Sequence, residues 1–243
     1  MGILKIYKPI GKTPLDMIEN LKLDKKYTHV KMSYAGRLDP MAEGLLIILT
    51  DETCLKQSMF HNLNKCYNFQ LLIGITTDTY DILGLVNWCK PKMIDYEHIN
   101  KTIDSFRGET CQSYPPFSSQ RVNGKPLWYY ARNNLLHTID IPSKTIHINT
   151  LSIKNISRVS RTDILQYVNS KIALLDTNKN FRQHDILKCW NSILDKQYTI
   201  IDIEAFVSCG TYIRTLCYDI GIKLGVPCMA YSIKRTRVGE YEL

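Results

Sequence analysis

An aspartate stands on a turn bounded by glycine and proline, directly before the most apolar run of the chain. The segment reads YAGRLDPMAEG from Tyr34 to Gly44, with Asp39 at its centre, and the aliphatic run Leu45–Leu49 follows it. A buried strand would anchor this loop, and the loop would present the carboxylate at the mouth of the strand. An Asx-turn ahead of the proline would explain the same aspartate without any chemistry, so the segment alone leaves both interpretations open.

A second segment places an arginine near the start of an expected helix. It reads SCGTYIRT from Ser208 to Thr215, follows an alternating strand pattern and opens a helix that continues through Leu224. Glycine permits the tight turn, and the helix N-terminus offers free N–H groups and the positive end of the helix dipole. Arg214 could pair with a carboxylate here, but a solvated arginine on a helix face fits the same pattern.

A third segment mixes aromatic rings with basic side chains. It reads SYPPFSSQRVNGKPLWYYAR from Ser113 to Arg132, a composition that suits stacked bases and phosphates. A loop whose aromatic side chains cover the core is the alternative interpretation. The chain has 31 lysines and arginines against 23 aspartates and glutamates, which gives a net charge of +8. This excess favours a polyanionic partner such as nucleic acid.

Cysteine and hydrophobic spacing exclude several other kinds of site. The eight cysteines contain no C-x-x-C pair, and no two histidines lie three to five residues apart, so we expect no structural zinc site. Scattered cysteines in a chain of this length are typical of a reducing compartment, which predicts a cytoplasmic protein. The longest aliphatic run, Leu45–Leu49, is far below the roughly 18 residues that a spanning helix needs, so we expect no membrane segment.

Strand and helix patterns are interspersed without regular alternation, which predicts an α+β fold with a mixed or mainly antiparallel sheet. No repeat or low-complexity tract divides the sequence, so we expect one domain over 1–243. A polar, helix-prone stretch at about 157–196 is typical of an insertion between two strands. The patterns predict strands near 3–7, 45–50, 67–73, 146–153, 201–205 and 229–238, and helices near 13–23, 95–106 and 126–133.

Taken together, these segments resemble the TruB family of RNA pseudouridine synthases, whose usual target is a uridine in the T-loop of tRNA. The similarity runs in order along almost the whole chain. The aspartate loop alone would also fit the ribosomal pseudouridine synthases, whereas the proline-rich loop and the TYIR helix start select TruB. The matching segments are KPIG at 8–11, GRLDP at 36–40, KCY at 65–67, TDTYDILG at 77–84, the proline-rich loop at about 111–126, GTYIRT at 210–215 and RTRVG at 235–239.

The resemblance implies a central RNA-binding cleft in the sheet and a role for each site residue. Asp39 would be the nucleophile, Arg214 the partner that favours its ionised form, and Tyr67 the ring that stacks on the flipped uracil. Uridine-to-pseudouridine conversion has no net redox change, so we expect neither a cofactor nor a metal. The expected partner is RNA, at the T-arm of tRNA (position 55), bound by a monomer. The residues implied for substrate binding are Tyr34, Tyr212, Ile233, Lys8 and Pro9.

Three features depart from the family pattern. Tyr34 and Ala35 stand where the family commonly has histidine and threonine, and that histidine helps to open the T-loop. The chain ends shortly after Gly239, so we expect no C-terminal PUA domain, the small RNA-binding domain frequent in the family. The stretch at 157–196 has no counterpart in the pattern.

These departures leave other functions open. One alternative is a pseudouridine synthase that acts on another RNA. A second is a catalytically silent RNA-binding protein that keeps the fold, although such a protein would tolerate loss of Asp39, Tyr67 and Arg214, all of which are present. A third is a retaining glycosidase that uses Asp39 and Glu43, but these acids lie in one loop and no sugar-binding signature accompanies them.

Overall fold

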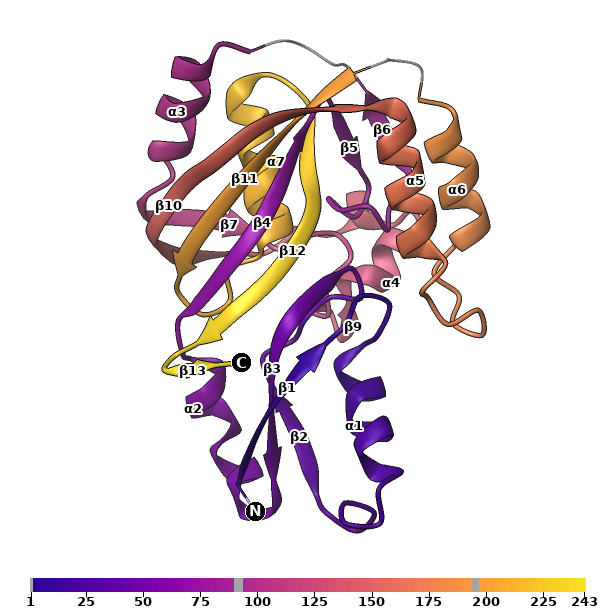
Figure 1. Cartoon of the computed structure of the whole chain (residues 1–243), viewed down its shortest axis with the longest axis vertical. Helices are drawn as coiled ribbons and strands as arrows, with labels where there is room; N and C mark the ends of the chain where they lie inside the picture. Colours follow the sequence, from indigo (N-terminus) through magenta and orange to yellow (C-terminus); the bar gives the residue numbers. More distant parts are fainter. Residues whose placement is uncertain (1, 90–93, 194–196) are drawn as a thin grey trace.

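One long mixed sheet runs through the molecule and carries the segments singled out above (Figure 1). The structure is a computed structural model that describes residues 2–89, 94–193 and 197–243. Within these residues β3 and β12 run parallel and the other neighbouring strands run antiparallel, which confirms the predicted α+β fold with a mixed sheet. The strands across the sheet are β1 (Ile3–Lys8), β3 (Ala42–Thr50), β12 (Cys228–Val238), β4 (Lys65–Ile73), β11 (Gln197–Val207), β10 (Ser143–Ser160) and β7 (Gly108–Ser113), with β2 (Met32–Ala35) beside β3 and β13 (Tyr241–Glu242) beside β12.

Helices and two small hairpins surround this sheet. Their ends follow local sequence signals: Thr13 caps the first helix and exchanges capping-box hydrogen bonds with Asp16, and Gly225 ends the last long helix in a left-handed conformation. The helices are α1 (Pro14–Lys22), η1 (Asp51–Lys56), α2 (Gln57–His61), α3 (Tyr96–Asp104), α4 (Leu127–Arg132), η2 (Leu136–Thr138), α5 (Arg161–Ile172), α6 (Gln183–Asn191) and α7 (Ile213–Leu224), and the hairpin strands are β5 (Ile75–Thr77) with β6 (Val86–Cys89) and β8 (Arg121–Val122) with β9 (Lys125–Pro126).

The sheet is buried on both faces where β4 and β11 cross the middle of the molecule. Successive side chains of a strand point to opposite faces, and here the two faces belong to different cores. Leu71 joins the core formed with α3 and α7, whereas Leu72 joins the core formed with α5 and α6. Figure 1 shows these two helix pairs at opposite sides of the sheet. Because both faces of β4 and β11 are covered by helices, both strands have long apolar runs in their sequence.

The aspartate loop enters the sheet at the point where β3 meets β12. Only Ala42–Gly44 of β3 lies in register with β12, and the rest of β3 pairs with β1 and β2. Gly44 has φ of +111°, and a β-carbon there would lie 2.2 Å from the backbone oxygen of Arg235. Only glycine fits at this close approach. The start of β3, and with it the aspartate loop, is therefore held against β12.

The stretch at 157–196 differs in part from its prediction. Residues 157–160 are the end of β10, where Ser157 pairs with Ile200 and Ser160 with Gln197. The helical part begins only at Arg161, because Ser160 caps α5 through hydrogen bonds with Asp163. Helices α5 and α6 then form one cover of the sheet before the chain returns in β11. Residues 194–196 of the predicted stretch lie outside the described residues.

A hairpin lies inside the proline-rich loop that the sequence predicts at about 111–126. Strands β8 and β9 pair around Asn123 and Gly124, whose φ angles of +49° and +79° are those of a tight Asn-Gly hairpin turn. The Tyr130 hydroxyl donates a hydrogen bond to the Val122 backbone oxygen and ties the hairpin to α4. The loop is therefore held in a defined position beside the sheet.

Candidate active site

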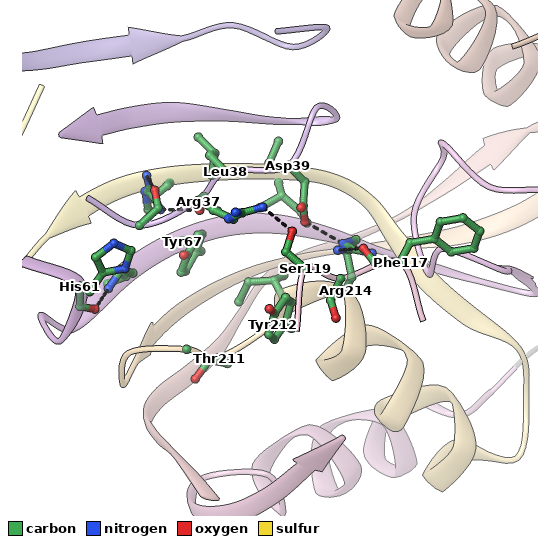
Figure 2. Close-up of a pocket in the computed structure, with 18 residues that line it drawn as sticks. Arg37, Leu38, Asp39, His61, Tyr67, Phe117, Ser119, Thr211, Tyr212 and Arg214 are labelled. Atoms are coloured by element: carbon green, nitrogen blue, oxygen red, sulfur yellow. Dashed lines mark hydrogen bonds and ion pairs between the residues drawn. The ribbon is translucent and has the colours of Figure 1, made fainter. Parts of the chain in front are cut away.

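A cavity of about 290 Å³ opens where the aspartate loop, the start of β4 and the start of α7 meet (Figure 2). Asp39, Tyr67 and Arg214 line it together, although Asp39 and Arg214 are 175 residues apart in the sequence. Phe117 and Ser119 of the proline-rich loop line another side of the cavity. The structure thus brings the three predicted catalytic residues to one place.

Arg214 joins three separate segments at this cavity. Its Nε donates a hydrogen bond to Asp39 Oδ2 at 2.7 Å, and its Nη1 donates to the Thr79 backbone oxygen at 2.7 Å. Its Nη2 donates to the backbone oxygen of Phe117 at 3.4 Å. The guanidinium therefore fixes the aspartate loop, the loop after β5 and the proline-rich loop relative to one another. A planar group with several donors in fixed directions is suited to this task.

The charge of Arg214 is compensated by carboxylates on two sides. Arg214 is buried, with 3% of its surface exposed, and it lies in the first turn of α7, where the helix dipole disfavours a cation. Burial lowers the pKa of Arg214, but Asp39 and Asp81 raise it, and the net effect is a raised pKa. The Asp39 side chain keeps 37% of its surface exposed toward the cavity, so a carboxylate held by a permanent cation remains accessible to a substrate.

The hydrogen bonds of Asp39 separate the two interpretations that the sequence left open. An Asx-turn would direct the carboxylate to backbone N–H groups of its own loop. In the described part of the chain, the hydrogen bond to the Asp39 carboxylate comes from Arg214. The turn itself is closed by the backbone, since the Ala42 N–H donates to the Asp39 carbonyl oxygen at 3.0 Å. The side chain of Asp39 is thus free of a turn-forming role.

A second arginine, on β12, holds the aspartate loop by hydrogen bonds to backbone oxygens of the loop and of β3. Arg235 of β12 is fully buried and donates hydrogen bonds to the backbone oxygens of Leu45, Arg37 and Gly36 at 2.8, 3.1 and 3.3 Å. On the opposite side, the Gly11 N–H donates to the Pro40 oxygen at 2.9 Å. The segments RTRVG and KPIG therefore hold the loop that carries Asp39.

Asp81 is a site residue that the sequence analysis did not assign. It is buried, accepts hydrogen bonds from Thr79 Oγ1 at 2.6 Å and from the Leu83 N–H at 2.9 Å, and lies 3.7 Å from Arg214 Nε. Burial raises the pKa of Asp81 to about 6, against the opposing effect of Arg214. The sequence feature that could have identified Asp81 is the TDTYDILG segment, which contains two aspartates, Asp78 and Asp81. The sequence alone does not show which of them faces Arg214.

If the site catalyses the uridine isomerisation that the family resemblance implies, we expect Asp81→Asn to slow its single-turnover rate about tenfold with RNA affinity unchanged. Asparagine keeps both hydrogen bonds but removes the charge that faces Arg214. The pKa of Asp81 is about 6, so the wild-type protein loses this charge as the pH falls through that value, and its rate should fall with it. The variant has no carboxyl group there and should lack this part of the pH profile. Rates measured from pH 5 to 8 check this, and identical profiles would contradict it.

Three of the residues implied for substrate contact form the walls of the cavity. Tyr67 lies on β4, Tyr212 precedes α7 and Ile233 lies on β12, and all three line the cavity beside Asp39. Burial, and then the nearby Asp39 charge, raise the pKa of Tyr212 to about 12, so its hydroxyl is neutral at physiological pH. Tyr114 packs edge-on against Tyr212, with ring centroids 5.7 Å apart. The walls thus offer aromatic and aliphatic surfaces to a planar ring.

Lys8 and Pro9, for which the resemblance implies substrate binding, do not line either cavity that contains Asp39. Lys8 is fully buried, and its Nζ donates to the backbone oxygens of Pro9 and Lys12 at 2.9 and 2.7 Å. Burial lowers the pKa of Lys8 to about 8. Its hydrogen bonds close the turn whose Gly11 holds the aspartate loop, so Lys8 supports the site instead of reaching into it. Pro9 is exposed beside this turn.

Tyr34 lines a second cavity of about 480 Å³ on another side of Asp39. This cavity shares Asp39, Arg37 and Arg214 with the first and includes Trp128 of α4. Tyr34 is therefore next to the cavity that holds Tyr67, but not inside it.

The described residues contain no group of three or more histidine, cysteine, aspartate or glutamate side chains that could hold a metal ion. Among the helices that the structure describes, none is both long and apolar enough to cross a bilayer. The groups at the cavity include the Asp39 carboxylate with its partner Arg214, the tyrosine walls, and the basic side chains of Arg37, His61, Lys65 and Arg235.

Comparison with known proteins gives the same family along nearly the whole chain. The model of the TruB family pseudouridylate synthase (N terminal domain) matches residues 24–171. The tRNA pseudouridine synthase B of Clostridium acetobutylicum is 30% identical over 240 residues, which cover 99% of this chain and 68% of that protein. The corresponding protein of Mycoplasma mobile is 31% identical and covers 98% and 69%, and that of Thermotoga petrophila is 30% identical and covers 100% and 64%. The chain spans about two thirds of the length of these relatives.

A solved structure shares the fold. The crystal structure of a Cbf5-Nop10-Gar1 complex contains a chain that matches 99% of this one over 50% of its own length, with a TM-score of 0.62 and 17% identity. At this identity the likeness concerns the fold alone. The family match includes the aspartate loop and the proline-rich loop, and the matched relatives extend through the α7 segment that carries Arg214. The chain belongs to the TruB family of pseudouridylate synthases.

Proposed function

We propose that the chain isomerises a uridine of tRNA to pseudouridine, in the T-loop, with Asp39 as the nucleophile. The observation that carries this proposal is the Asp39–Arg214 pair at a cavity walled by Tyr67 and Tyr212. The relatives named above are tRNA pseudouridine synthases B. The positive net charge of +8 suits an RNA substrate.

The reaction needs one ionised carboxylate and a site that holds a base outside its helix. The bond between N1 and C1′ breaks, the uracil turns within the cavity, and a bond forms between C5 and C1′. The proton on C5 leaves and N1 gains a proton, so atoms and electrons balance without an oxidant. Asp39 serves either by attack at C1′ or by removal of the proton on C2′, and both routes use the carboxylate that accepts the hydrogen bond from Arg214.

The walls of the cavity suit a flipped uracil. An enzyme that acts on a base inside a stem–loop must extrude the nucleotide and hold the base between apolar or aromatic side chains. Tyr67 and Tyr212 are aromatic walls and Ile233 is an aliphatic one, all next to the exposed face of Asp39. We propose that Tyr67 stacks on the uracil and relays the proton that leaves C5.

The glycosidase alternative would need Glu43 beside Asp39, and Glu43 lines neither cavity that contains Asp39. A retaining glycosidase places two carboxyl groups on either side of one bond, about 5 Å apart. Glu43 accepts a hydrogen bond from the Tyr7 hydroxyl and lines a separate cavity with Lys154 and Lys234. Asp39 and Glu43 therefore do not face one another across either cavity that contains Asp39. Asp81 lines the second cavity and lies 3.7 Å from Arg214 Nε.

Release of tritium from tRNA that carries uridine labelled at C5 tests the proposal. Isomerisation replaces the hydrogen on C5, so label should enter water in proportion to the pseudouridine formed. A silent RNA-binding protein would bind the tRNA without release, and a glycosidase would leave an abasic site with the label still on free uracil. Binding without release would refute the proposed enzymatic function.

We propose further that one chain suffices for the reaction and that it acts in the cytoplasm. The seven cysteines whose side chains are described are free thiols, as expected in a reducing compartment. Asp39, Tyr67 and Arg214 all come from one chain, so the site needs no contribution from a second copy. Sedimentation of the active protein at assay concentration should show a monomer, and activity confined to a larger species would contradict this proposal.

Tyr34 provides a prediction about folded RNA. If its ring fills the space left by the extruded base, the contribution comes from ring area and not from charge. Tyr34→Phe should then keep wild-type activity, whereas Tyr34→Ala should slow modification of a folded T-arm more than of an unstructured strand of the same sequence. Single-turnover rates on the two RNAs check this. Equal losses on both would mean that Tyr34 only packs against the loop.

A further inference from the structure

The cavity around Asp39 has two ends with different charge balance. At one end Arg214 faces the carboxylates of Asp39 and Asp81. Figure 2 shows His61 at the opposite end, with Tyr67 between it and Arg214 in this view. Arg37, Lys65 and Arg235 line the cavity together with His61. We call these four residues, Arg37, His61, Lys65 and Arg235, the cationic end. Within this group the Arg37 side chain reaches from the His61 side toward Ser119 and Asp39 (Figure 2).

Arg37, Lys65 and Arg235 of this end have hydrogen-bond acceptors but, within the described residues, no counter-ion. Lys65 Nζ donates to the backbone oxygens of His61 and Leu63 at 2.9 and 2.5 Å, and Arg235 donates to three backbone oxygens. Arg37 donates to the hydroxyl of Ser119. Within the described residues, none of the three forms an ion pair with a carboxylate. Carbonyl groups satisfy the N–H donors but leave the net positive charge.

Two of these cations converge beneath the loop that carries Asp39. Lys65 and Arg235 are 6% and 0% exposed, and a β-carbon at Gly36 would meet Lys65 Cε at 3.4 Å and Arg235 Nη1 at 3.5 Å. Buried charge without a partner is costly, because water no longer solvates it. Burial and the charge of Arg235 accordingly lower the pKa of Lys65 to about 8. An anion placed at this end would relieve that cost.

Arg37 and His61 are the members of this end that an incoming group can touch. Arg37 is exposed and His61 is half-buried, whereas Lys65 and Arg235 lie behind them. His61 ends α2, and the charged groups that face it are Lys65 from β4, Arg37 from the aspartate loop and Arg235 from β12. Burial, followed by these three positive charges, lowers the pKa of His61, so the free protein holds a neutral imidazole there at physiological pH.

We propose that the cationic end binds a backbone phosphate next to the target uridine, and that His61 takes up a proton when this phosphate arrives. The proposal rests on the proposed RNA substrate and specifies where its strand is held. Arg37 and the protonated His61 would contact the phosphate oxygens, while Lys65 and Arg235 supply charge from below. A phosphate fixed at one end and the carboxylate of Asp39 at the other would set how far the nucleotide enters the cavity.

Binding-linked proton uptake is the property that a purely structural histidine would lack. A negative phosphate beside His61 would oppose the positive charges of Lys65, Arg37 and Arg235 and would raise the pKa of His61 in the complex. The affinity for RNA should therefore rise as the pH falls. Each unit of increase in the pKa on binding corresponds to about a tenfold gain in affinity at low pH. The useful window is pH 5.5 to 7.5, because Lys65 and Lys8, with pKa values of about 8, remain protonated there.

The experiment measures affinity and proton uptake for a T-arm stem–loop that already carries pseudouridine at the target position, so that no turnover occurs. Calorimetry in buffers of different ionisation enthalpy gives the number of protons bound on complex formation. The wild-type protein should take up protons on binding between pH 5.5 and 7.5 and bind more tightly at pH 6 than at pH 7.5, by about tenfold for each unit by which the pKa of His61 rises within that window. His61→Gln should lose the proton uptake attributed to His61 and most of the pH dependence, and should bind more weakly than the wild-type protein at pH 6.

Two controls assign the effect. His98→Gln changes an exposed histidine of α3 outside the cavity and should behave as wild type. Asp81 also titrates near pH 6, so the readout is the difference between wild-type protein and His61→Gln. A stem–loop with an uncharged methylphosphonate in place of one phosphate flanking the target should abolish that difference at one of the two positions.

Three results would overturn the inference. They are proton uptake that is equal in wild-type protein and His61→Gln, a pH dependence that survives His61→Gln, and no response to either methylphosphonate. If tritium release from C5 is intact in any of these cases, the proposed function stands and only the phosphate site is refuted. A chain that neither binds the stem–loop nor releases label would refute both.

Discussion

Asp39→Asn is expected to lower the rate of pseudouridine formation by on the order of 10³-fold or more. Asparagine keeps the size of the side chain, and its oxygen still accepts the hydrogen bond from Arg214 Nε. It loses the negative charge and with it the nucleophile. RNA affinity should be unchanged or slightly higher, because the lost carboxylate repels phosphate. The measurement is the single-turnover rate on a tRNA transcript, with binding followed in parallel.

A matched control is Asp140→Asn, since Asp140 is an exposed loop aspartate outside the cavity. It should behave as wild type in rate and affinity. If Asp39 served only to form a turn, Asn would replace it almost without loss. An Asp39→Asn protein that still isomerises uridine at an appreciable rate would therefore remove Asp39 from the mechanism.

Arg214→Lys should slow the reaction about 100-fold, although it conserves the charge. A lysine has one donor group in place of the planar fork and cannot reach Asp39, the Thr79 oxygen and the Phe117 oxygen together. Asp39 then loses its fixed orientation, and the proline-rich loop loses its tie to α7. We also expect a lower melting temperature, because buried carbonyl groups are left without donors.

Arg107→Lys provides the comparison for this variant. Arg107 is exposed, pairs with Asp104 and lies outside both cavities that contain Asp39, so the same substitution there should leave the rate intact. The rate is measured at a temperature well below the melting temperature of each variant. Wild-type turnover by a folded Arg214→Lys protein would show that the three-way hydrogen bonding of Arg214 is dispensable.

Local sequence signals were sufficient for most of the sheet and for the principal pair of the site. The alternating and apolar runs that predict strands at 67–73 and 229–238 lie within β4 and β12, because both strands are buried on two faces. Asp39 and Arg214 could be singled out because each stands in a distinctive turn or helix start. Their pairing was implied by the family resemblance, and the structure shows the 2.7 Å contact.

Features that depend on distant contacts could not be predicted from the sequence. Lys8 has the residue type of a phosphate ligand, and only its burial shows that it closes a turn. Asp81 stands in a polar segment typical of an exposed loop, whereas the fold places it behind Arg214. Residues 157–160 have few apolar side chains, and their strand conformation comes from pairing with the start of β11.

Mapping of pseudouridine in an unmodified tRNA transcript tests the central claim most directly. The transcript is incubated with the wild-type protein or with Asp39→Asn, and pseudouridine is located at single-nucleotide resolution by chemical derivatisation and reverse transcription. We predict one modified uridine, in the T-loop, with the wild-type protein and none with the variant. Modification only outside the T-loop, or equal modification by both proteins, would contradict it.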